Sequence, residues 1–483
     1  HPSDSAPHVA QMLFNSLAFL VFLPVVLSAA SVLPLRWRNR WLLIASYYFY
    51  GSWDWRFLGL IFISTLTDFL VGRGIYASPS AGRRKRLLLC SISISLGILG
   101  FFKYFNFFVD SAAALLGAIG VQAHLPTLQV ILPVGISFYT FQSMSYSIDI
   151  YRRHIVPMRN FLDYALYVSY FPQLVAGPIE RAQHLAPQIL LPTRITAERI
   201  NVALTLILIG FAKKVLIADA IAPEVNRIFA DPAAMSSGLL LKGAYLFAFQ
   251  IYGDFSGYSD IARGISELFG IRLMVNFNQP YLAASITEFW RRWHISLSTW
   301  LRDYVYIPLG GNRHGARQTY RNLILTMLIG GVWHGANWTF VVWGGLHGLL
   351  LAAERALGID SAKQPHGRLT GTQWLRRLAG MLLTFHLVVF LWIFFRAPSF
   401  AVAFQYMAGL AQLTRLTAVG PLPFVVAFAV LLIDIPQNRW GEHAIFLRLP
   451  WWLRSPAYAA VFLAVVAQLL YATQETPFIY FQF

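Results

Sequence analysis

Long apolar runs separated by short polar segments are the main pattern of this chain. A straight membrane-spanning helix needs roughly 20 apolar residues, and segments that fall short are tolerated only when protein buries them or they line a cavity. The runs that predict spanning segments are Leu13–Leu35, Trp41–Trp53, Phe57–Val71, Leu87–Val109, Thr127–Ile148, Val202–Ala220, Leu239–Tyr252, Leu323–Trp333, Trp338–Ala353, Leu375–Phe395, Phe424–Ile433 and Tyr458–Tyr471. We therefore predict an all-α integral membrane protein with about eleven transmembrane helices plus re-entrant or interfacial helices.

The amino-terminal segment differs from the rest. Residues 1–11 are polar and precede a plausible native start at Met12, so we interpret them as a disordered cloning remnant. Leu13–Leu35 is too long for the apolar core of a signal peptide and is expected to be retained as a span. No long linker, low-complexity run or repeat interrupts residues 12–483, which we expect to form a single membrane domain.

Composition agrees with a membrane setting. Of the 483 residues, 57% are hydrophobic and only 12% are charged, whereas soluble domains carry about 25% charged residues. The net charge of +17 resides in short clusters between apolar runs, at Arg36–Arg40, Arg83–Arg86 and Arg152–Arg153. Such clusters mark the cytoplasmic face and can contact anionic lipid headgroups, so nucleic acid is not the expected partner.

The same clusters predict the orientation of the chain. If Arg36–Arg40 and Arg83–Arg86 are both inside, the amino terminus lies outside and Trp41–Val71 forms an out-and-back hairpin. The single cysteine, Cys90, excludes an internal disulfide framework and thiolate-cluster metal sites.

Polar residues become dense between Asp254 and Asn322. Within this stretch the apolar side chains of Phe289, Trp293, Leu297 and Trp300 recur at helical spacing. This pattern predicts an amphipathic helix that lies at the membrane surface or dips into the protein.

A histidine inside an apolar segment is the strongest chemical signal. His334 stands in the string Gly330–Asn337, between the apolar runs around it. Ionisable groups at bilayer depth are costly and usually face a functional cavity, and histidine exchanges protons near neutral pH. A structural histidine hydrogen bonded between helices is the alternative.

His294 is the second imidazole of interest, and the fold could bring it to His334. One histidine could act as a general base while glycine-flanked backbone N–H groups, Asn337 or His294 stabilise developing charge. The alternative for His294 is a Trp-His pair, with Trp293, that reaches toward the interface.

Other candidates rank lower. His347 suggests an inter-helix hydrogen bond, and Lys213-Lys214 suggests side chains that reach toward headgroups. Asp254–Asp260 could line a polar path, although a helix-capping turn is the preferred interpretation. The sequence has no metal-ligand spacing, glycine-rich phosphate loop or nucleophile elbow, so covalent catalysis is not favoured.

Longer motifs carry a resemblance to a known family. Ser285–Ser298, Trp300–Tyr304 and Gly330–Asn337 resemble the membrane-bound O-acyltransferase (MBOAT) family, most closely its bacterial alginate O-acetylating branch. Supporting strings are Leu132–Phe138, Ser145–Arg152, Ala176–Pro178 and Asp254–Asp260. The similarity extends from Met12 to about Arg396 and becomes weaker afterwards.

The resemblance implies a multi-spanning fold around a central tunnel, with His334 catalytic and His294 at the second active-site position. Further candidates for the substrate path are Asn337, Trp333, Trp293, Asp254, Ser256, Arg302 and Asp303. The resemblance also implies acetyl transfer from a cytoplasmic thioester, either acetyl-coenzyme A or an acetyl-carrier protein. The acetyl group would cross the bacterial inner membrane for O-acetylation of an alginate-type exopolysaccharide. Expected partners are membrane lipids, periplasmic acetyltransferases and possible acyl-carrier proteins; no bound cofactor or metal is expected.

Four alternatives remain open at this point. Within the fold, the acceptor could be cellulose or another exopolysaccharide, or the reaction could be D-alanyl transfer to teichoic acid. A proton-coupled transporter would show inverted half-repeats and more mid-span acidic residues, and neither is clear in the sequence. A purely structural scaffold would leave both histidine motifs without a reason.

Overall fold

The computed structural model describes residues 12–121, 127–128, 131–359, 370–412, 417–471 and 478–479. Regular structure within these ranges is helical, and they contain no β-strand, which confirms the predicted all-α class. Residues 1–11, interpreted as a cloning remnant, lie outside the described residues. Contacts divide the chain into two compact units, His1–Ile207 with Ile261–Met274 and Leu208–Asp260 with Val275–Phe483. The single-domain assignment of residues 12–483 stays a prediction.

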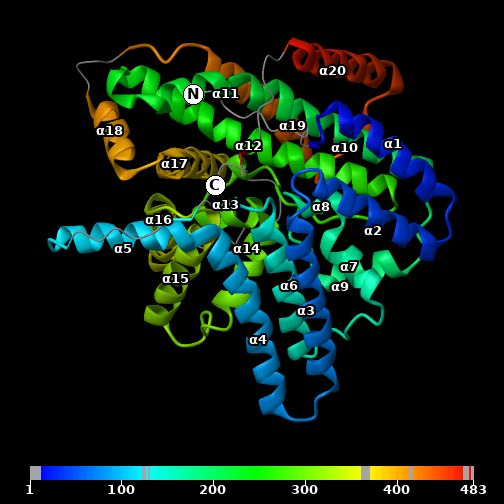
Figure 1. Ribbon diagram of the computed structural model, residues 1–483. Coiled ribbons are helices and arrows are strands. Elements are labelled where there is room, and N and C mark those ends of the chain that lie inside the picture. The colour runs from blue at the N-terminus through cyan, green and yellow to red at the C-terminus, as the bar shows by residue number, and fades with distance from the viewer. Residues whose placement is uncertain are drawn as a thin grey trace, which may run out of the picture. The chain divides into compact units, whose positions relative to one another are not determined.

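In the first unit a helical core forms around α3. Its helices are α1 (Leu17–Val32), α2 (Leu35–Gly51), α3 (Phe57–Ala77), α4 (Ala81–Leu99), η1 (Gly100–Tyr104), α5 (Phe105–Ala118), α6 (Ile136–Tyr151), α7 (Phe161–Ser169), α8 (Phe171–Leu174), α9 (Ala182–Leu190), the start of α10 (Ala197–Phe211) and the end of α12 (Ser237–Leu268) from residue 261. Helix α3 packs on α4, α6 and α7 (Figure 1). Buried Asp68 of α3 accepts hydrogen bonds from Ser91 and Ser147, as a polar group inside an apolar bundle requires.

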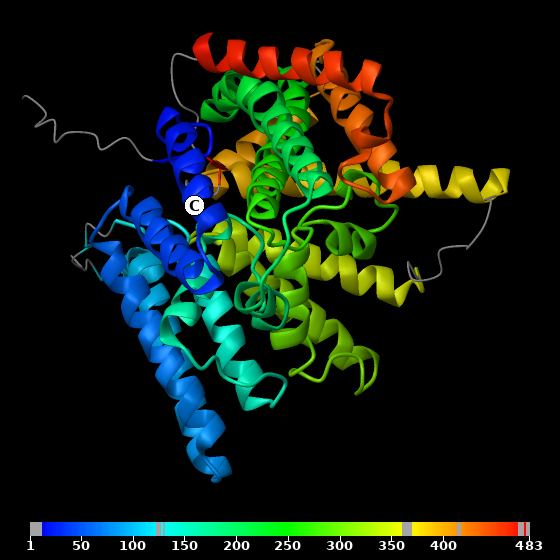
Figure 2. The ribbon, with the colours of Figure 1, turned by 90° about the vertical axis from the view of Figure 1, so that its right-hand side faces the viewer.

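The second unit contains the segments in which the sequence places its chemistry. Its helices are the end of α10, η2 (Ala212–Asp219), α11 (Ala220–Ala230), η3 (Pro232–Ala234), α12 (Ser237–Leu268, to residue 260), η4 (Pro280–Leu282), α13 (Ile286–Arg292), α14 (Ile295–Leu301), η5 (Arg302–Tyr306), α15 (Ala316–His334), α16 (Trp338–Ala356), α17 (Gly371–Arg396), α18 (Phe400–Ala411), α19 (Leu422–Trp440), η7 (Ile445–Arg448) and α20 (Trp451–Tyr471). Helices α15 and α16 form a hairpin that lies side by side in both ribbon views (Figures 1 and 2).

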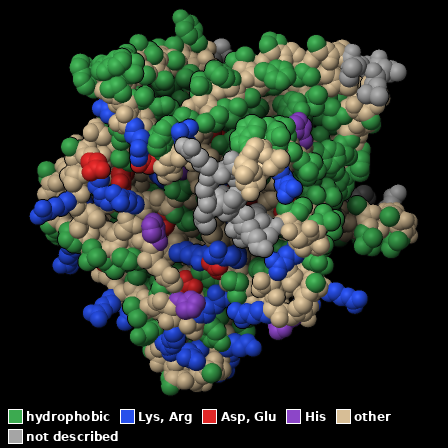
Figure 3. All heavy atoms as spheres, turned by 180° about the vertical axis from the view of Figure 1, so that it is seen from behind, with side chains coloured by type: hydrophobic (Ala, Val, Ile, Leu, Met, Phe, Trp, Pro, Cys, Tyr) green, Lys and Arg blue, Asp and Glu red, His purple; other side chains and the backbone are tan. Residues whose placement is uncertain are grey.

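Six helical stretches in the described residues are long and apolar enough to cross a membrane: Phe57–Ala77, Ala81–Ala118, Ala197–Ala230, Gly371–Arg396, Leu422–Trp440 and Trp451–Tyr471. Leu17–Val32 and Phe400–Ala411 are shorter apolar helices. The other predicted segments lie on α2, α6, α12, α15 and α16, which do not meet that criterion, so the expected number of about eleven spans stays a prediction. Figure 3 shows broad hydrophobic areas on one face beside areas rich in Lys and Arg, as expected of a membrane protein.

Two glycines allow α15 and α16 to touch backbone to backbone. A Cβ at Gly331 would overlap the carbonyl oxygen of Phe340, and one at Gly344 would overlap that of Met327. Small residues at a helix crossing permit this approach inside membranes. The close crossing fixes the position of the turn that follows α15, where His334 lies.

We predict that Gly344→Ala destabilises the protein, because the added methyl group must separate the two helices. An overpacked core position costs about 1–3 kcal/mol in free energy of unfolding, which denaturant titration of the purified protein in detergent measures. Gly97→Ala is the matched control, since Gly97 lies on exposed α4 surface with open space around it. It should leave stability equal or raise it by up to about 1 kcal/mol. Equal effects of the two substitutions would contradict the close crossing.

Candidate functional site

His334 is the last residue of α15 and is buried, with 2% of its surface exposed. The chain then extends through Gly335, where a Cβ would overlap the ring of Phe340, and restarts as α16 behind Asn337. Asn337 caps α16: its Oδ1 accepts from Thr339 N at 3.0 Å, and its Nδ2 donates to Pro398 O at 2.8 Å. The side-chain amide of Asn337 therefore holds the turn in place.

His294 lies at a sharp break between α13 and α14. Its backbone is left-handed, with φ 44° and ψ 54°, and the residue is fully buried. A continuous amphipathic helix over this segment is therefore a wrong prediction, although its apolar side chains are all buried as the pattern requires: Phe289, Trp293, Leu297 and Trp300. The segment lies inside the protein, and the interfacial reading of His294 is also wrong. A left-handed histidine carries strain of about 1–3 kcal/mol, which persists only where surrounding contacts hold it.

Asn276 holds this break from both backbone and side chain. Its carbonyl oxygen accepts from Ile295 N at 2.9 Å, and its Oδ1 accepts from Ser296 N at 3.1 Å and from Ser296 Oγ at 2.9 Å. The same Oδ1 lies 3.3 Å from His294 Nδ1. A backbone N–H can only donate, so the Asn276 atom is an oxygen and His294 Nδ1 carries the proton. The neutral ring then keeps its lone pair on Nε2.

The two histidines meet inside an aromatic enclosure. Their ring centroids are 6.3 Å apart, and Trp333 contacts both, at 5.7 Å from His294 and 5.0 Å from His334. Trp343 and Phe395 lie 5.0 and 5.3 Å from His334. On the other side, Phe255 of α12 lies 4.7 Å from His294. The sequence alone gave no signal for Asn276, Trp343, Phe395 or Phe255, because their roles depend on contacts between distant segments.

Burial determines the charge of His294. The absence of solvent around the imidazole lowers its pKa to about 3, so the ring is neutral at physiological pH. A neutral imidazole can hydrogen bond to a hydroxyl or accept its proton. Polar interactions in such an enclosure are also stronger than in water.

The remaining tryptophan and histidine candidates support the enclosure. Trp293 is fully buried against Phe277 and Trp392, at 5.0 and 5.1 Å between ring centroids. His347 of α16 accepts at Nδ1 from Trp290 Nε1 of α13 at 3.2 Å. This contact confirms the inter-helix hydrogen bond predicted for His347.

Two lysines of η2 form a buried ionic cluster with Asp219 of the same element and with Asp254 and Asp260 of α12. Lys213 Nζ lies 2.9 Å from Asp260, and Lys214 Nζ lies 2.6 Å from Asp254 and 2.7 Å from Asp219. Asp254 also accepts from Ile479 N at 2.6 Å. Both lysines are at most 6% exposed, so the prediction that they reach toward headgroups is wrong. The helix-capping interpretation is wrong as well, since Asp254 and Asp260 lie inside α12.

The other candidates for the substrate path occupy separate positions. Ser256 is buried on α12, within the turn that carries Asp254. Arg302 and Asp303 lie on η5, where Arg302 Nε pairs with Asp303 Oδ1 at 2.6 Å and the arginine side chain is 59% exposed. The described residues contain no group of three or more His, Cys, Asp or Glu side chains that could hold a metal ion.

Comparison with known proteins matches the chain to one family. The family of membrane-bound O-acyltransferases, MBOAT, matches residues 151–384. A protein named probable alginate O-acetylase from Azotobacter vinelandii is 42% identical over 514 residues, covering 98% of this chain and all of the relative. The protein of the same name from Pseudomonas aeruginosa is 46% identical, covering 82% of this chain and 74% of the relative. A peptidoglycan O-acetyltransferase from Helicobacter pylori is 36% identical, covering 83% and 80%.

We predict that His294 makes stability sensitive to acid. Its pKa is lower in the folded protein than the value near 6.5 of an unfolded chain, so the unfolded state binds the proton first. The contribution is present above pH 6.5 and is lost as the pH falls toward 3, by up to about 1.4 kcal/mol per pH unit. Thermal unfolding of wild type and His294→Gln should therefore show a difference in Tm that shrinks between pH 7 and pH 5. A difference that stays constant over this range would contradict a neutral, buried His294.

We also predict that Lys213→Met is strongly destabilising, because it leaves Asp260 buried beside one fewer positive charge. Removing one partner of a buried pair costs about 3–5 kcal/mol in free energy of unfolding. Arg302→Met is the matched control at an exposed pair, where the expected cost is below about 1 kcal/mol. Chemical denaturation in detergent compares them. If both variants lost a similar amount of unfolding free energy, the lysine cluster would not be important for stability.

Proposed function

The chain belongs to the membrane-bound O-acyltransferase family, and on this basis we propose that it transfers acetyl groups from a cytoplasmic thioester for the O-acetylation of a secreted, alginate-type exopolysaccharide. Membership in the family makes the protein a membrane acyltransferase. The observation that carries the finer proposal is the pair of buried histidines, 6.3 Å apart within aromatic walls. Relatives that are 42% and 46% identical to the chain are named probable alginate O-acetylases, which supports acetyl as the group and alginate as the polymer.

In the proposed reaction, an acceptor hydroxyl attacks the carbonyl carbon of the thioester. A C–O bond forms, the C–S bond breaks, and the hydroxyl proton passes to His334 and then to the departing thiolate. A hydroxyl group has a pKa far above 7, so removing its proton during attack contributes roughly 10²–10⁴-fold to the rate. His334 is proposed for this role because it ends a rigid helix inside the enclosure.

His294 is proposed to orient the acceptor. With Nδ1 held by Asn276, its lone pair on Nε2 can accept a hydrogen bond from a hydroxyl group. The low pKa of His294 makes it a weak proton acceptor, so His294 is not the proposed base. In this tautomer His294 does not donate to an oxyanion.

The developing oxyanion needs donors from other groups. Asn337 already uses its amide to hold Pro398, so it is a poor candidate. The indole Nε1 of Trp343 is buried and has no hydrogen-bond partner among the described residues, and its ring contacts His334. We propose this N–H together with the backbone of the Gly335 turn as the donors.

Donor, partners and location follow from the proposed transfer across the membrane. Acetyl-coenzyme A or an acetyl-carrier protein would deliver the thioester from the cytoplasm as a substrate. Periplasmic acetyltransferases would receive the acetyl group or pass it to the polymer, which requires the chain to lie in the bacterial inner membrane. The clusters Arg36–Arg40 and Arg83–Arg86 support an amino terminus outside. The identity to a peptidoglycan O-acetyltransferase makes peptidoglycan a second candidate acceptor. Acetylated cellulose and D-alanyl transfer to teichoic acid rank below both.

Thioester turnover by the purified protein tests this proposal. We expect wild type in nanodiscs to release thiol from acetyl-coenzyme A or acetyl-carrier protein, and His334→Ala to lower the rate by roughly 10²–10⁴-fold. His314→Ala is the matched control, because His314 is exposed ahead of α15. It should retain wild-type turnover.

The outcomes separate the parts of the proposal. Equal turnover in wild type and a folded His334→Ala protein would remove His334 as the base. If the wild-type protein released thiol from neither acetyl-coenzyme A nor acetyl-carrier protein, the proposed donors would be contradicted. Ester content of alginate and of peptidoglycan from cells that express wild type or His334→Ala then identifies the acceptor, since only the true polymer should lose acetyl groups in the variant.

A further inference from the structure

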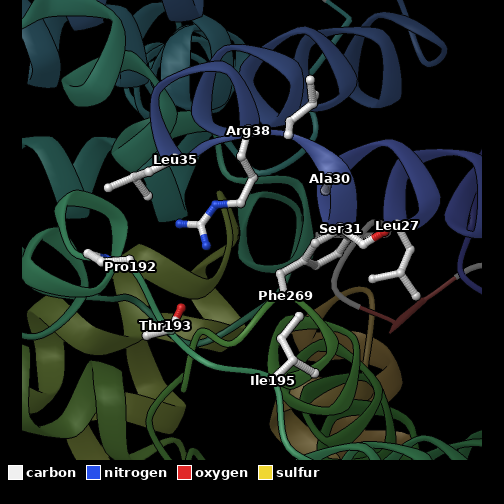
Figure 4. Close-up of a pocket in the computed structure, with 10 residues that line it drawn as sticks. Leu27, Ala30, Ser31, Leu35, Arg38, Pro192, Thr193, Ile195 and Phe269 are labelled. Atoms are coloured by element: carbon white, nitrogen blue, oxygen red, sulfur yellow. The ribbon is translucent and has the colours of Figure 1, made fainter.

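A small cavity opens in the first unit beside the start of α2. Its volume is about 180 Å³, and Figure 4 shows Arg38 extending from α2 into it, toward the segment that carries Thr193. Arg38 is the one charged side chain in its lining, and Ser31 and Thr193 supply hydroxyl groups. The other lining residues are Leu27, Ala30, Leu33, Leu35, Pro192, Ile195 and Phe269. Among the described lining residues, a single positive charge therefore faces a mostly apolar space with two hydroxyl groups.

Arg38 lacks the counter-charge that its burial demands. Only 9% of its surface is exposed, yet the ion pairs among the described residues do not include it. Its guanidinium makes one long hydrogen bond, 3.4 Å to Asn39 Oδ1, and its Nε has no hydrogen-bond partner in the described part of the chain. The neighbouring Arg40 shows the contrast, since it pairs with Asp163 at 3.0 Å. Buried charges are normally paired, so the surroundings of Arg38 favour an anion beside its guanidinium.

The helix itself adds to the positive potential. Helix α2 has 17 residues and begins at Leu35 behind Pro34, which provides no side-chain cap, and its first turn contains no acidic residue. Leu33 and Leu35 line the cavity, so the amino-terminal end of α2 lies at its edge. Unsatisfied N–H groups and the helix dipole favour an anion at such an end. The buried guanidinium and the uncapped helix are independent features that require the same kind of ligand.

We propose that this cavity binds the phosphate group of an anionic membrane lipid. Drug-sized ligands occupy roughly 300 Å³ or more, so a space of about 180 Å³ admits a charged head and excludes the acyl chains. The chains would lie on the apolar outer surface of α1, where Leu20 and Val25 are 58% and 56% exposed. Trp37, which precedes Arg38 in the sequence, is 62% exposed, as is typical of an indole at the membrane interface. Free phosphate has the same chemistry as the lipid head group, but it has no apolar part that could contact the apolar lining.

Lipid-dependent stability tests the proposal with the full chain in detergent. Phosphatidylglycerol should raise the Tm of wild type, and phosphatidylcholine at equal concentration should not. In Arg38→Gln the apparent affinity for phosphatidylglycerol should be at least about tenfold weaker, because a charge-assisted hydrogen bond is lost. At the lipid concentration used for wild type, the Tm shift should therefore disappear. Arg36→Gln is the matched control, since Arg36 belongs to the same cluster but is exposed. It should keep the wild-type shift.

Further measurements make the outcome decisive. Without anionic lipid, Arg38→Gln should be at least as stable as wild type, because the substitution removes a buried charge that has no partner. Arg38→Lys retains the charge and should keep part of the shift, so it tests the site if the glutamine variant does not fold. If inorganic phosphate stabilised wild type as strongly as the lipid does, the ligand would be a soluble phosphate, and the proposal of a lipid would be overturned. Equal phosphatidylglycerol shifts in wild type and both Arg38 variants would overturn the site itself.

Discussion

The backbone contact between α15 and α16 is the constraint on which the second unit depends. Gly331 and Gly344 allow the two helices to approach until their main chains touch, and the short turn that follows leaves His334 at the apex of a rigid hairpin. Trp343 comes from the same hairpin and packs against that imidazole. Helix α13, which leads to the second histidine, is attached to α16 through Trp290 and His347. Both histidines are therefore positioned by the geometry of one helix crossing.

His294 is held in a conformation that is locally unfavourable in free energy. A left-handed backbone and complete burial of an imidazole are each unfavourable. Asn276 compensates by satisfying two backbone N–H groups at the break and by fixing the tautomer of the ring. Such over-determined strain is common at functional sites, where a side chain must keep a single orientation.

The sequence predicted the residue types of the site better than their connections. Both histidines and the all-helical class followed from local motifs and long apolar runs. The break at His294 did not, because the apolar spacing from Phe289 to Trp300 stays regular across it while a backbone φ leaves no trace in the pattern. The ionic cluster was missed for a related reason: Lys213 lies in η2 and Asp260 in α12, and their pairing depends on how distant helices pack. The number of spans depends on packing in the same way, since short helices cross or stop according to their neighbours.

Charged side chains of α12 and η2 pair with one another, which bears on the proposed acyl transfer. Asp254 and Asp260 are engaged by lysines, so these carboxylates do not compete for a substrate proton. Phe255, next to Asp254, instead presents an aromatic ring to His294. The enclosure thus contains the neutral imidazole of His294, the imidazole of His334 and indole rings. In the proposed transfer, N–H dipoles of the indole and the backbone would stabilise the oxyanion. Dipoles aimed at a developing charge favour a transition state over a ground state, which is the property that the proposed transfer requires.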